Sequence, residues 1–402
     1  MSTANEVFVF DAVRSPRGRA REGGGLAKIA PVETVKQLAD ALVDRNGPDA
    51  RKIDHFMLGC VGQVGVQGGH IALVAKLHAG LPREAPAWSL NNFCVSGLTA
   101  VGAATDRIIA GGAELVLAGG VESMSQVPFL ADQASYYMDP AFSAALHYIP
   151  VALSADVLAT QEKIGREQLD EMTVQSHLNA AAAIRDNRAQ QSLIPIKAAD
   201  GSVALAHDEY VRADTTTQKL GRFPAAFGEL DPQYAPVVRA ALGMERIDHV
   251  HAVVHAPGVA DGAGLALLGT AAAGKARGLK ARAQVIATAE AAGDPVLGLT
   301  AGRTAMERVL AKAGLTLNDI DLIEYMEAFA VVPALFVRDY PQARAKMNAH
   351  GGHVARGHAL GATGAILLST LIDGLEQKDL RTGMVVAFAA SGIGAAMIVR
   401  RV

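Results

Sequence analysis

Leu90-Asn91-Asn92-Phe93-Cys94-Val95-Ser96-Gly97-Leu98 is the most informative stretch of this chain, because it places a cysteine where an apolar segment ends and a helix begins. The unpaired N–H groups and the dipole at a helix N-terminus lower the pKa of a thiol, and the thiolate is the nucleophilic form. Gly97 would let a substrate or another backbone approach closely. The stretch therefore predicts a nucleophile at Cys94, and the alternative is that Cys94 is a small buried apolar residue.

Composition restricts the class of protein. The chain has 402 residues, more than a single core usually holds, so we expect two or three domains. Half of its residues are hydrophobic and 5% are aromatic, which is typical of soluble α/β proteins. The net charge of -3, without runs of like charge, indicates no nucleic-acid surface.

Location follows from what the sequence lacks. Residues 1–10 show no signal-peptide pattern, and no uncharged apolar run reaches the ~18 residues of a membrane span. Two cysteines, Cys60 and Cys94, form no disulfide framework and suit a reducing compartment. We therefore expect a cytoplasmic protein without a membrane span.

Strand and helix patterns alternate along the chain and predict a parallel sheet with helices on its faces. Strands are expected at 7–10, 55–59 and 114–119, and helices at 31–44, 68–79 and 95–110. The C-terminal part repeats the plan, because a helix at 361–375 leads to a strand at 383–388. We infer a duplicated α/β unit.

The middle of the chain differs from both halves. Residues 121–250 carry many charges and scattered Pro and Gly, with a helix expected at 166–185. We interpret this segment as an inserted loop domain. The predicted division is thus 1–120, 121–250 and 251–402.

The glycine-rich segments differ in the ligand chemistry that they could support. Gly23-Gly24-Gly25 lacks the lysine of a P-loop, and no Gly-x-Gly-x-x-Gly follows a strand in the required context, which argues against those nucleotide sites. In contrast, His350, His353 and His358 lie among glycines before a predicted helix, where an imidazole could take a proton from a thiol. The alternatives are solvated loop histidines or, with little support from their spacing, a zinc site.

Several blocks together resemble the thiolase family. They are Asn91 to Leu98, Gly119-Gly120-Val121-Glu122-Ser123-Met124-Ser125, Glu327-Ala328-Phe329-Ala330 and Asn348 to Gly364, in the family's order over essentially the whole chain. The opening Ala12-Val13-Arg14-Ser15-Pro16-Arg17-Gly18-Arg19 is most similar to the bacterial fatty-acid-oxidation branch.

The resemblance implies a fold and a set of roles. The fold would be two duplicated α/β halves in a five-layered α-β-α-β-α core, with an inserted loop domain that faces coenzyme A. Cys94 would accept an acyl group from acyl-CoA, and His358 would activate it. The backbone N–H groups of Cys94 and Ala390 would form an oxyanion site. Coenzyme A would be met by Lys219 and Arg222 of the loop domain and by Ala328 and Phe329.

The resemblance also implies partners. The substrate would be an acyl-CoA, with no permanently bound cofactor and no metal. Members of the family assemble as homodimers or homotetramers, and some have a fatty-acid-oxidation partner subunit.

Departures from the family pattern concern the chemistry. A second active-site cysteine is expected at the position of Phe388, and the usual Asn or His of the first oxyanion site is Met326. Neither side chain can transfer a proton or donate to an oxyanion. A family serine near the pantetheine is Pro257, Phe223 takes a commonly basic position, and the proline after the catalytic histidine is Ala359, which should leave His358 less rigidly placed.

Two hypotheses follow from these matches and departures. The first is a thiolase-type acyltransferase with weakened or redirected carbon–carbon chemistry, in which His350, His353 or His255 could replace the missing base. The second is a catalytically degenerate binding or scaffolding protein. Cys94 and His358 favour the first, and Phe388 and Met326 favour the second.

Overall fold

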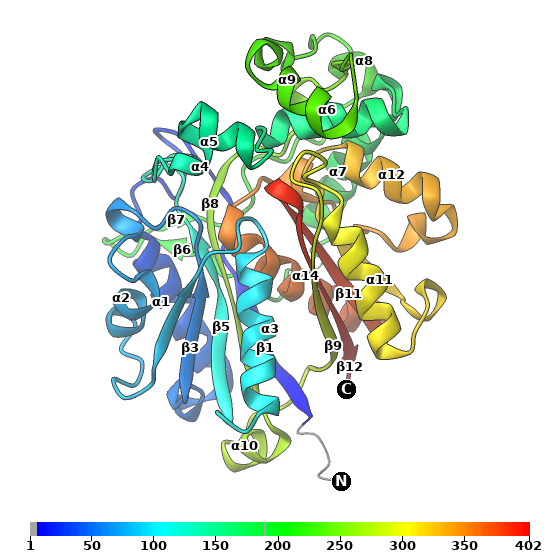
Figure 1. Ribbon diagram of the computed structural model, residues 1–402. Coiled ribbons are helices and arrows are strands. Elements are labelled where there is room, and N and C mark those ends of the chain that lie inside the picture. Colours follow the sequence, from blue (N-terminus) through cyan, green and yellow to red (C-terminus); the bar gives the residue numbers. More distant parts are fainter. Residues whose placement is uncertain (1–5, 189) are drawn as a thin grey trace.

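A ten-stranded mixed sheet runs through the whole of the computed structural model, which describes residues 6–188 and 190–402. Its strand order is β10-β11-β12-β9-β1-β8-β5-β3-β4, with β2 pairing to β8 (Figure 1). The strands are β1 (Val7–Arg14), β2 (Gly18–Arg19), β3 (His55–Gly59), β4 (Ala87–Leu90), β5 (Leu115–Glu122), β8 (Ala260–Gly269), β9 (Ala283–Ala292), β10 (Leu322–Tyr325), β11 (Thr382–Ala389) and β12 (Ile393–Arg401). Residues 1–5, which belong to the stretch without a signal-peptide pattern, lie outside the described residues.

The expectation of a parallel sheet is correct for only part of it. Parallel pairs join β3 to β4 and β5, and β10 to β11. The strands between them, β8, β1, β9 and β12, pair antiparallel with their neighbours. Sequence periodicity predicted only β1, β3, β5 and β11 of these strands. It gave no sign of the pairing, because buried strands of both kinds read as apolar runs.

Two central helices lie between the halves of the sheet. Helix α3 (Ser96–Ile109) and helix α14 (Thr363–Gln377) each contact strands of both halves. Their first turns meet backbone to backbone, since a Cβ on Gly97 would lie 2.6 Å from the Gly361 oxygen and one on Gly364 would lie 2.5 Å from the Leu98 nitrogen. The close approach expected at Gly97 is thus made by another backbone.

Outer helices complete the layers. Helices α1 (Pro31–Asn46) and α2 (Ile71–His78) cover the N-terminal half, and α11 (Ala301–Ala313) covers β9 and β12. The layers are therefore α-β-α-β-α, which confirms the fold class expected from the resemblance. Two smaller C-terminal helices are α12 (Val331–Asp339) and α13 (His353–Arg356), and α10 (Ala271–Ala276) follows β8.

The segment between β5 and β8 forms helices above the upper ends of the central strands (Figure 1). They are α4 (Ser135–Met138), α5 (Pro140–Ala145), α6 (Val151–Glu162), α7 (Arg166–Arg185), α8 (Thr217–Leu220) and α9 (Asp231–Leu242), beside a two-stranded sheet of β6 (Ile196–Lys197) and β7 (Val203–Leu205). Part of the segment has its own apolar core around Tyr148 and Tyr234. The division of the chain at 120 and 250 stays a prediction. Among the described residues, no helix combines the length and apolarity needed to cross a membrane.

Candidate active site

Cys94 lies in a tight turn that leads into α3. Phe93 adopts a left-handed φ of 47°, and Ser96 Oγ closes the turn by accepting from the Asn92 N–H at 2.8 Å and donating to the Phe93 carbonyl at 2.5 Å. The helix begins at Ser96, two residues after Cys94. The turn therefore places Cys94 before the first turn of the helix rather than within it.

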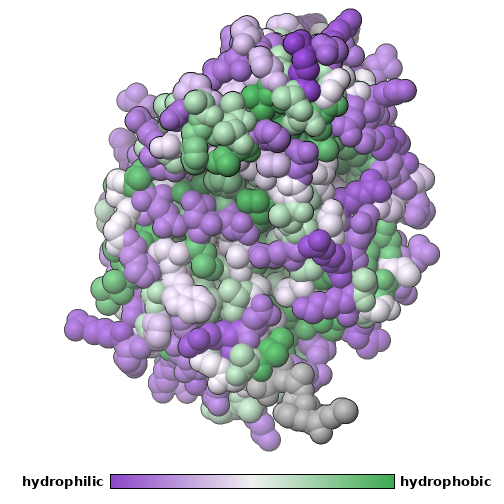
Figure 2. Space-filling view, viewed as in Figure 1, coloured by the Kyte–Doolittle hydropathy of each residue, from purple (hydrophilic) through white to green (hydrophobic). Residues whose placement is uncertain are grey.

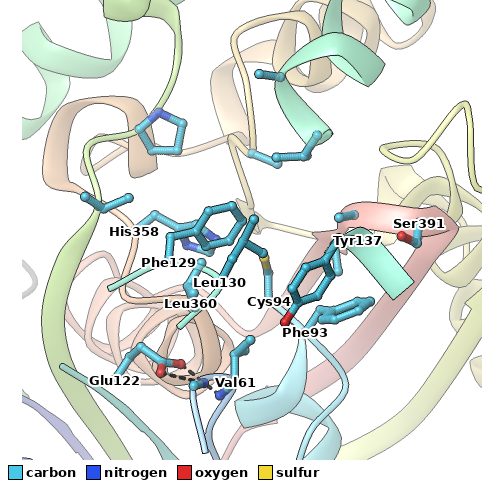
Figure 3. A pocket seen from close by; sticks show the side chains of 18 of the residues that line it. Val61, Phe93, Cys94, Glu122, Phe129, Leu130, Tyr137, His358, Leu360 and Ser391 are labelled. Carbon is cyan, nitrogen blue, oxygen red and sulfur yellow. Dashed lines mark hydrogen bonds between the residues drawn. The ribbon is translucent and has the colours of Figure 1, made fainter. Parts of the chain in front are cut away.

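A cavity of about 260 Å³ lies beside this thiol and is lined by most of the predicted site residues. Figure 3 shows Cys94 and His358 among the apolar side chains that line it. The sequence-predicted residues at its wall are Cys94, His358, Ala390, Ala328 and Phe329. Lys219 and Arg222 are not brought to it, because both are exposed, and Lys219 Nζ contacts the Asp214 carboxylate. Any contact they make with coenzyme A would be outside the cavity.

The protonation of Cys94 differs from the expectation. Burial raises the pKa of its thiol to about 12, and hydrogen bonds from the backbone N–H groups of Ala390 and of Cys94 itself only partly offset this. An apolar cavity destabilises a thiolate, and α3 starts too late for its first turn to compensate fully. The prediction of a lowered pKa was wrong. Cys94 rests as a thiol.

His358 is held as a neutral imidazole. Burial, with a smaller contribution from the Arg17 guanidinium, lowers the pKa of His358 to about 3. Its Nδ1 pairs with Thr363 Oγ1 at 2.8 Å, and its backbone is bonded to the Gly258 carbonyl and the Ala260 N–H. These bonds fix the position of the residue. With Nδ1 engaged, Nε2 is the ring nitrogen left to receive a proton.

Alkylation by iodoacetamide should distinguish the two thiols. Cys94 should react faster than Cys60 because Cys94 lines the cavity, whereas Cys60 is fully buried and its Sγ lies 3.6 Å from Glu122 Oε1. Since the pKa of Cys94 is raised in the folded state, its alkylation rate should still increase above pH ~8.5, which is the usual pKa of a free thiol. Rates measured between pH 6 and 10 check this. A plateau below pH 8 would show an activated thiolate, and equal rates would remove the distinction.

Phe388 and Met326 are packed into the core rather than arranged for proton transfer. The Phe388 ring lies against Gly302 of α11 and 5.0 Å from the Tyr325 ring, so it closes the cavity floor on the side of β11. Met326 is fully buried, and its Sδ accepts from the Phe388 N–H at 3.4 Å. Neither side chain carries a group that could transfer a proton.

The histidines considered as replacement bases do not line the cavity. His255 is engaged on both sides, by Asp170 Oδ1 at 2.7 Å and by the Ala252 N–H at 3.0 Å. His350 and His353 are at most 1% exposed and form no hydrogen bond through either ring nitrogen. The interpretation as solvated loop residues is therefore wrong. His353 packs edge-on against the His358 ring, with centroids 5.4 Å apart.

Sequence reasoning missed a buried cluster of charges behind His358. Asp208 accepts from Arg14 Nη1 at 2.9 Å, from Arg356 Nη1 at 2.6 Å and from the Arg17 backbone N–H at 2.9 Å. Arg17 in turn donates to the Gly357 carbonyl, next to His358, at 3.1 Å. These arginines hold the pKa of Asp208 far below its usual range despite burial. One carboxylate thus neutralises part of the charge of three buried guanidinium groups.

Glu122 is a second residue whose role was missed, although its sequence block was recognised. Its carboxylate accepts from the backbone N–H groups of Val61, Gly62 and Gly361 at 2.9 to 3.0 Å and from Gln67 Nε2 at 2.9 Å. Burial raises its pKa, and these donors oppose the shift. Glu122 therefore ties the end of β3 to the turn before α14. Among the described residues, His, Cys, Asp and Glu form no group of three that could hold a metal.

Comparison with known proteins decides the family. The thiolase N-terminal domain matches residues 7–230, and the thiolase C-terminal domain matches residues 279–401. The chain belongs to the thiolase family. It is 34% identical to a beta-ketoadipyl-CoA thiolase of Pseudomonas knackmussii, over 99% of this chain and 100% of that one. It is 32% identical to a 3-ketoacyl-CoA thiolase of Pseudoalteromonas translucida, over 99% of both.

Solved thiolase structures have the same fold. The crystal structure of the Bacillus anthracis acetyl-CoA acetyltransferase superposes with a TM-score of 0.85 at 29% identity, and human mitochondrial 3-ketoacyl-CoA thiolase with a TM-score of 0.86 at 27% identity. Both likenesses cover 100% of each chain. This chain therefore has the thiolase fold over the length that the two structures match.

Proposed function

We propose that this thiolase is an acyl-CoA acyltransferase that works through a thioester on Cys94. The observation that carries the proposal is the meeting of the Cys94 thiol, the His358 imidazole and the Ala390 backbone N–H at one cavity. A purely structural protein has no need of this arrangement. The substrate would be a coenzyme A thioester, and no permanently bound cofactor takes part.

Acyl transfer needs one proton to move in each direction. Nε2 of His358 accepts the Cys94 proton as the sulfur attacks the thioester carbonyl, provided that Nδ1–H donates to Thr363. The N–H groups of Ala390 and Cys94 then stabilise the carbonyl oxygen as it becomes negative. Collapse releases the coenzyme A thiolate, which takes the proton from His358. A neutral thiol and a neutral imidazole are suitable starting forms, since charge appears only during the reaction.

Carbon–carbon chemistry would be weakened in the same site. Cleavage of a 3-ketoacyl-CoA releases an enolate that must be protonated, and a general acid typically contributes about 10²- to 10⁴-fold. The ionisable side chains at the cavity are Cys94, Glu122, Asp132, Tyr137, Tyr148 and His358. Glu122 is occupied by four N–H donors, and Tyr137 OH contacts the Asp132 carboxylate. We therefore expect the protein to acylate Cys94 but to catalyse thiolysis of 3-ketoacyl-CoA only slowly.

Replacing Phe388 by Cys tests this directly. Thiolysis of 3-ketoacyl-CoA should rise by up to about 10²- to 10⁴-fold, because a proton carrier returns, and adding Met326→Asn should raise it further. Loss of the ring beside Gly302 and Tyr325 should cost about 3 to 5 kcal/mol of folding free energy, so unfolding must be measured beside the rate.

Phe388→Ser is the matched control, because it makes a similar cavity without a thiol. An equal gain in the Ser variant would assign the effect to space rather than to proton transfer. A wild-type rate on the order of 1 to 10³ per second would show that another residue already serves as the acid.

A catalytically degenerate binding or scaffolding protein is the second candidate. The burial of Phe388 and Met326 favours it, since both have become core residues. It predicts binding of coenzyme A esters without any adduct at Cys94. The two candidates therefore differ in a covalent product.

We also propose a homodimer or homotetramer acting in the cytoplasm, with a fatty-acid-oxidation partner subunit as a further possibility to test. The edge strand β4 supports an assembly, because it ends the sheet and its Trp88 side chain is 41% exposed, where a second copy could cover it. Free Cys60 and Cys94 agree with a reducing compartment. Sedimentation of the purified chain measures the assembly.

A further inference from the structure

A second cavity continues the one at Cys94. Its volume is about 380 Å³, and it shares Phe129, Leu130, Tyr137, Tyr148, Val151 and Ala152 with the first. Met138, Pro150, Gln233 and Tyr234 line only the second cavity. The two cavities therefore adjoin along this shared wall, and we take them together as one passage beneath the loop segment.

The shared wall comes from the segment that carries α4 and α5 and from the start of α6. Figure 3 shows Phe129 and Leu130 beside Cys94 and His358, with Tyr137 on the same wall. Leu130 adopts a left-handed φ of 64°, a costly conformation for a residue with a branched side chain. Figure 2 shows apolar side chains gathered over this region of the surface. They include Phe129, Met138, Phe142 and Leu146, each at least 43% exposed.

The charges of the passage have one sign. Glu122 and Asp132 line only the first cavity, His358 is held neutral, and no Lys or Arg is among the described residues that line either cavity. A tail carboxylate in the second cavity would lose its hydration and find no cation. An alkyl tail would lose nothing and would cover exposed aromatic surface.

We propose that the second cavity is the subsite for the acyl tail, and that it selects apolar tails and rejects tails that end in a carboxylate. The inference rests on the proposed function, since it takes the ligand to be an acyl-CoA. The proposed substrate therefore differs from the one in the name of the beta-ketoadipyl-CoA thiolase relative, because a ketoadipyl group ends in a carboxylate.

Octanoyl-CoA and suberyl-CoA are the matched probes, because both have eight-carbon acyl groups and only the second ends in a carboxylate. Dissociation constants should be measured calorimetrically on the Cys94→Ala variant, with butanoyl-CoA as the short reference. Each added methylene should tighten binding about fourfold, which corresponds to ~0.8 kcal/mol. Octanoyl-CoA should bind at least about tenfold more tightly than suberyl-CoA.

A charge placed in the second cavity should reverse part of this preference. Gln233 is exposed at the rim and lines only that cavity, so Gln233→Arg should lower the octanoyl-to-suberyl ratio severalfold. Gln233→Met keeps the length without the charge and should leave the ratio high. Gln175→Arg adds the same charge on the exposed face of α7, outside both cavities, and controls for long-range attraction.

Each outcome has a separate meaning. Equal affinities for the two probes, no dependence on chain length, or an equal effect of Gln175→Arg and Gln233→Arg would overturn the subsite. Wild-type protein that shows the predicted affinities but forms no acyl adduct would retain the subsite and remove the acyltransferase. An adduct with flat affinities would do the opposite, and failure of every CoA ester to bind would remove both.

Discussion

Replacing His358 by Ala should slow the acylation of Cys94 by about 10²- to 10⁴-fold, the effect of losing a general base. The imidazole is neutral at pH 7 because burial lowers its pKa to about 3, and its Nε2 is the acceptor that the cavity offers to a thiol whose own pKa is raised. Time-resolved mass spectrometry of the intact protein with octanoyl-CoA measures the rate.

His353→Ala is the control for this prediction. His353 packs on the His358 ring but does not line the cavity, so its loss should have the smaller effect. A larger loss in His353→Ala or His350→Ala would mean that the role of base has been assigned to the wrong histidine. Unchanged unfolding temperature in His358→Ala would separate a chemical effect from a structural one.

Replacing Asp208 by Ala should lower the free energy of unfolding by about 3 to 5 kcal/mol. Arg14, Arg17 and Arg356 are at most 2% exposed, and removal of their shared carboxylate would leave buried positive charges unpaired. Because the pKa of Asp208 is depressed in the folded state, its stabilisation is present above the unfolded value of ~3.9 and is lost as the pH falls below it. Urea unfolding at pH 7 gives the number.

Asp214→Ala supplies the matched comparison. Its partner Lys219 is exposed, and such surface pairs contribute at most about 1 kcal/mol. Similar losses in the two variants would contradict the account of the buried cluster. Since Arg17 also bonds the Gly357 carbonyl, Asp208→Ala should in addition slow acylation if the variant still folds.

Much of the fold could be predicted because local patterns determine it. The strand at 55–59 and the helix at 166–185 have the expected bounds. The close approach expected at Gly97 is also present, because the Gly361 backbone lies against it. Strand direction could not be predicted. The antiparallel pairing of β1 with β8 and β9 joins residues far apart in the sequence, and apolar runs carry no sign of it.

Motifs predicted which residues meet at the cavity, whereas the burial of the side chains around them could not be predicted. Cys94, His358 and Ala390 came from matching blocks, and the cavity brings them together. The raised pKa of Cys94, the buried His350 and His353, and the Asp208 cluster depend on which side chains exclude water, which one sequence does not state. The signal for the cluster was present in Arg17 and Arg356, two charges inside glycine-rich apolar blocks.

A thioester at Cys94 would change the mass of the intact protein after incubation with octanoyl-CoA. We expect one octanoyl adduct on the wild-type chain, located at Cys94 by peptide mapping and reversed by free coenzyme A. The Cys94→Ala variant should show none, and the Cys60→Ala variant should keep it. A wild-type chain that binds octanoyl-CoA and gains no mass, or one that carries the acyl group on Cys60, would contradict the account.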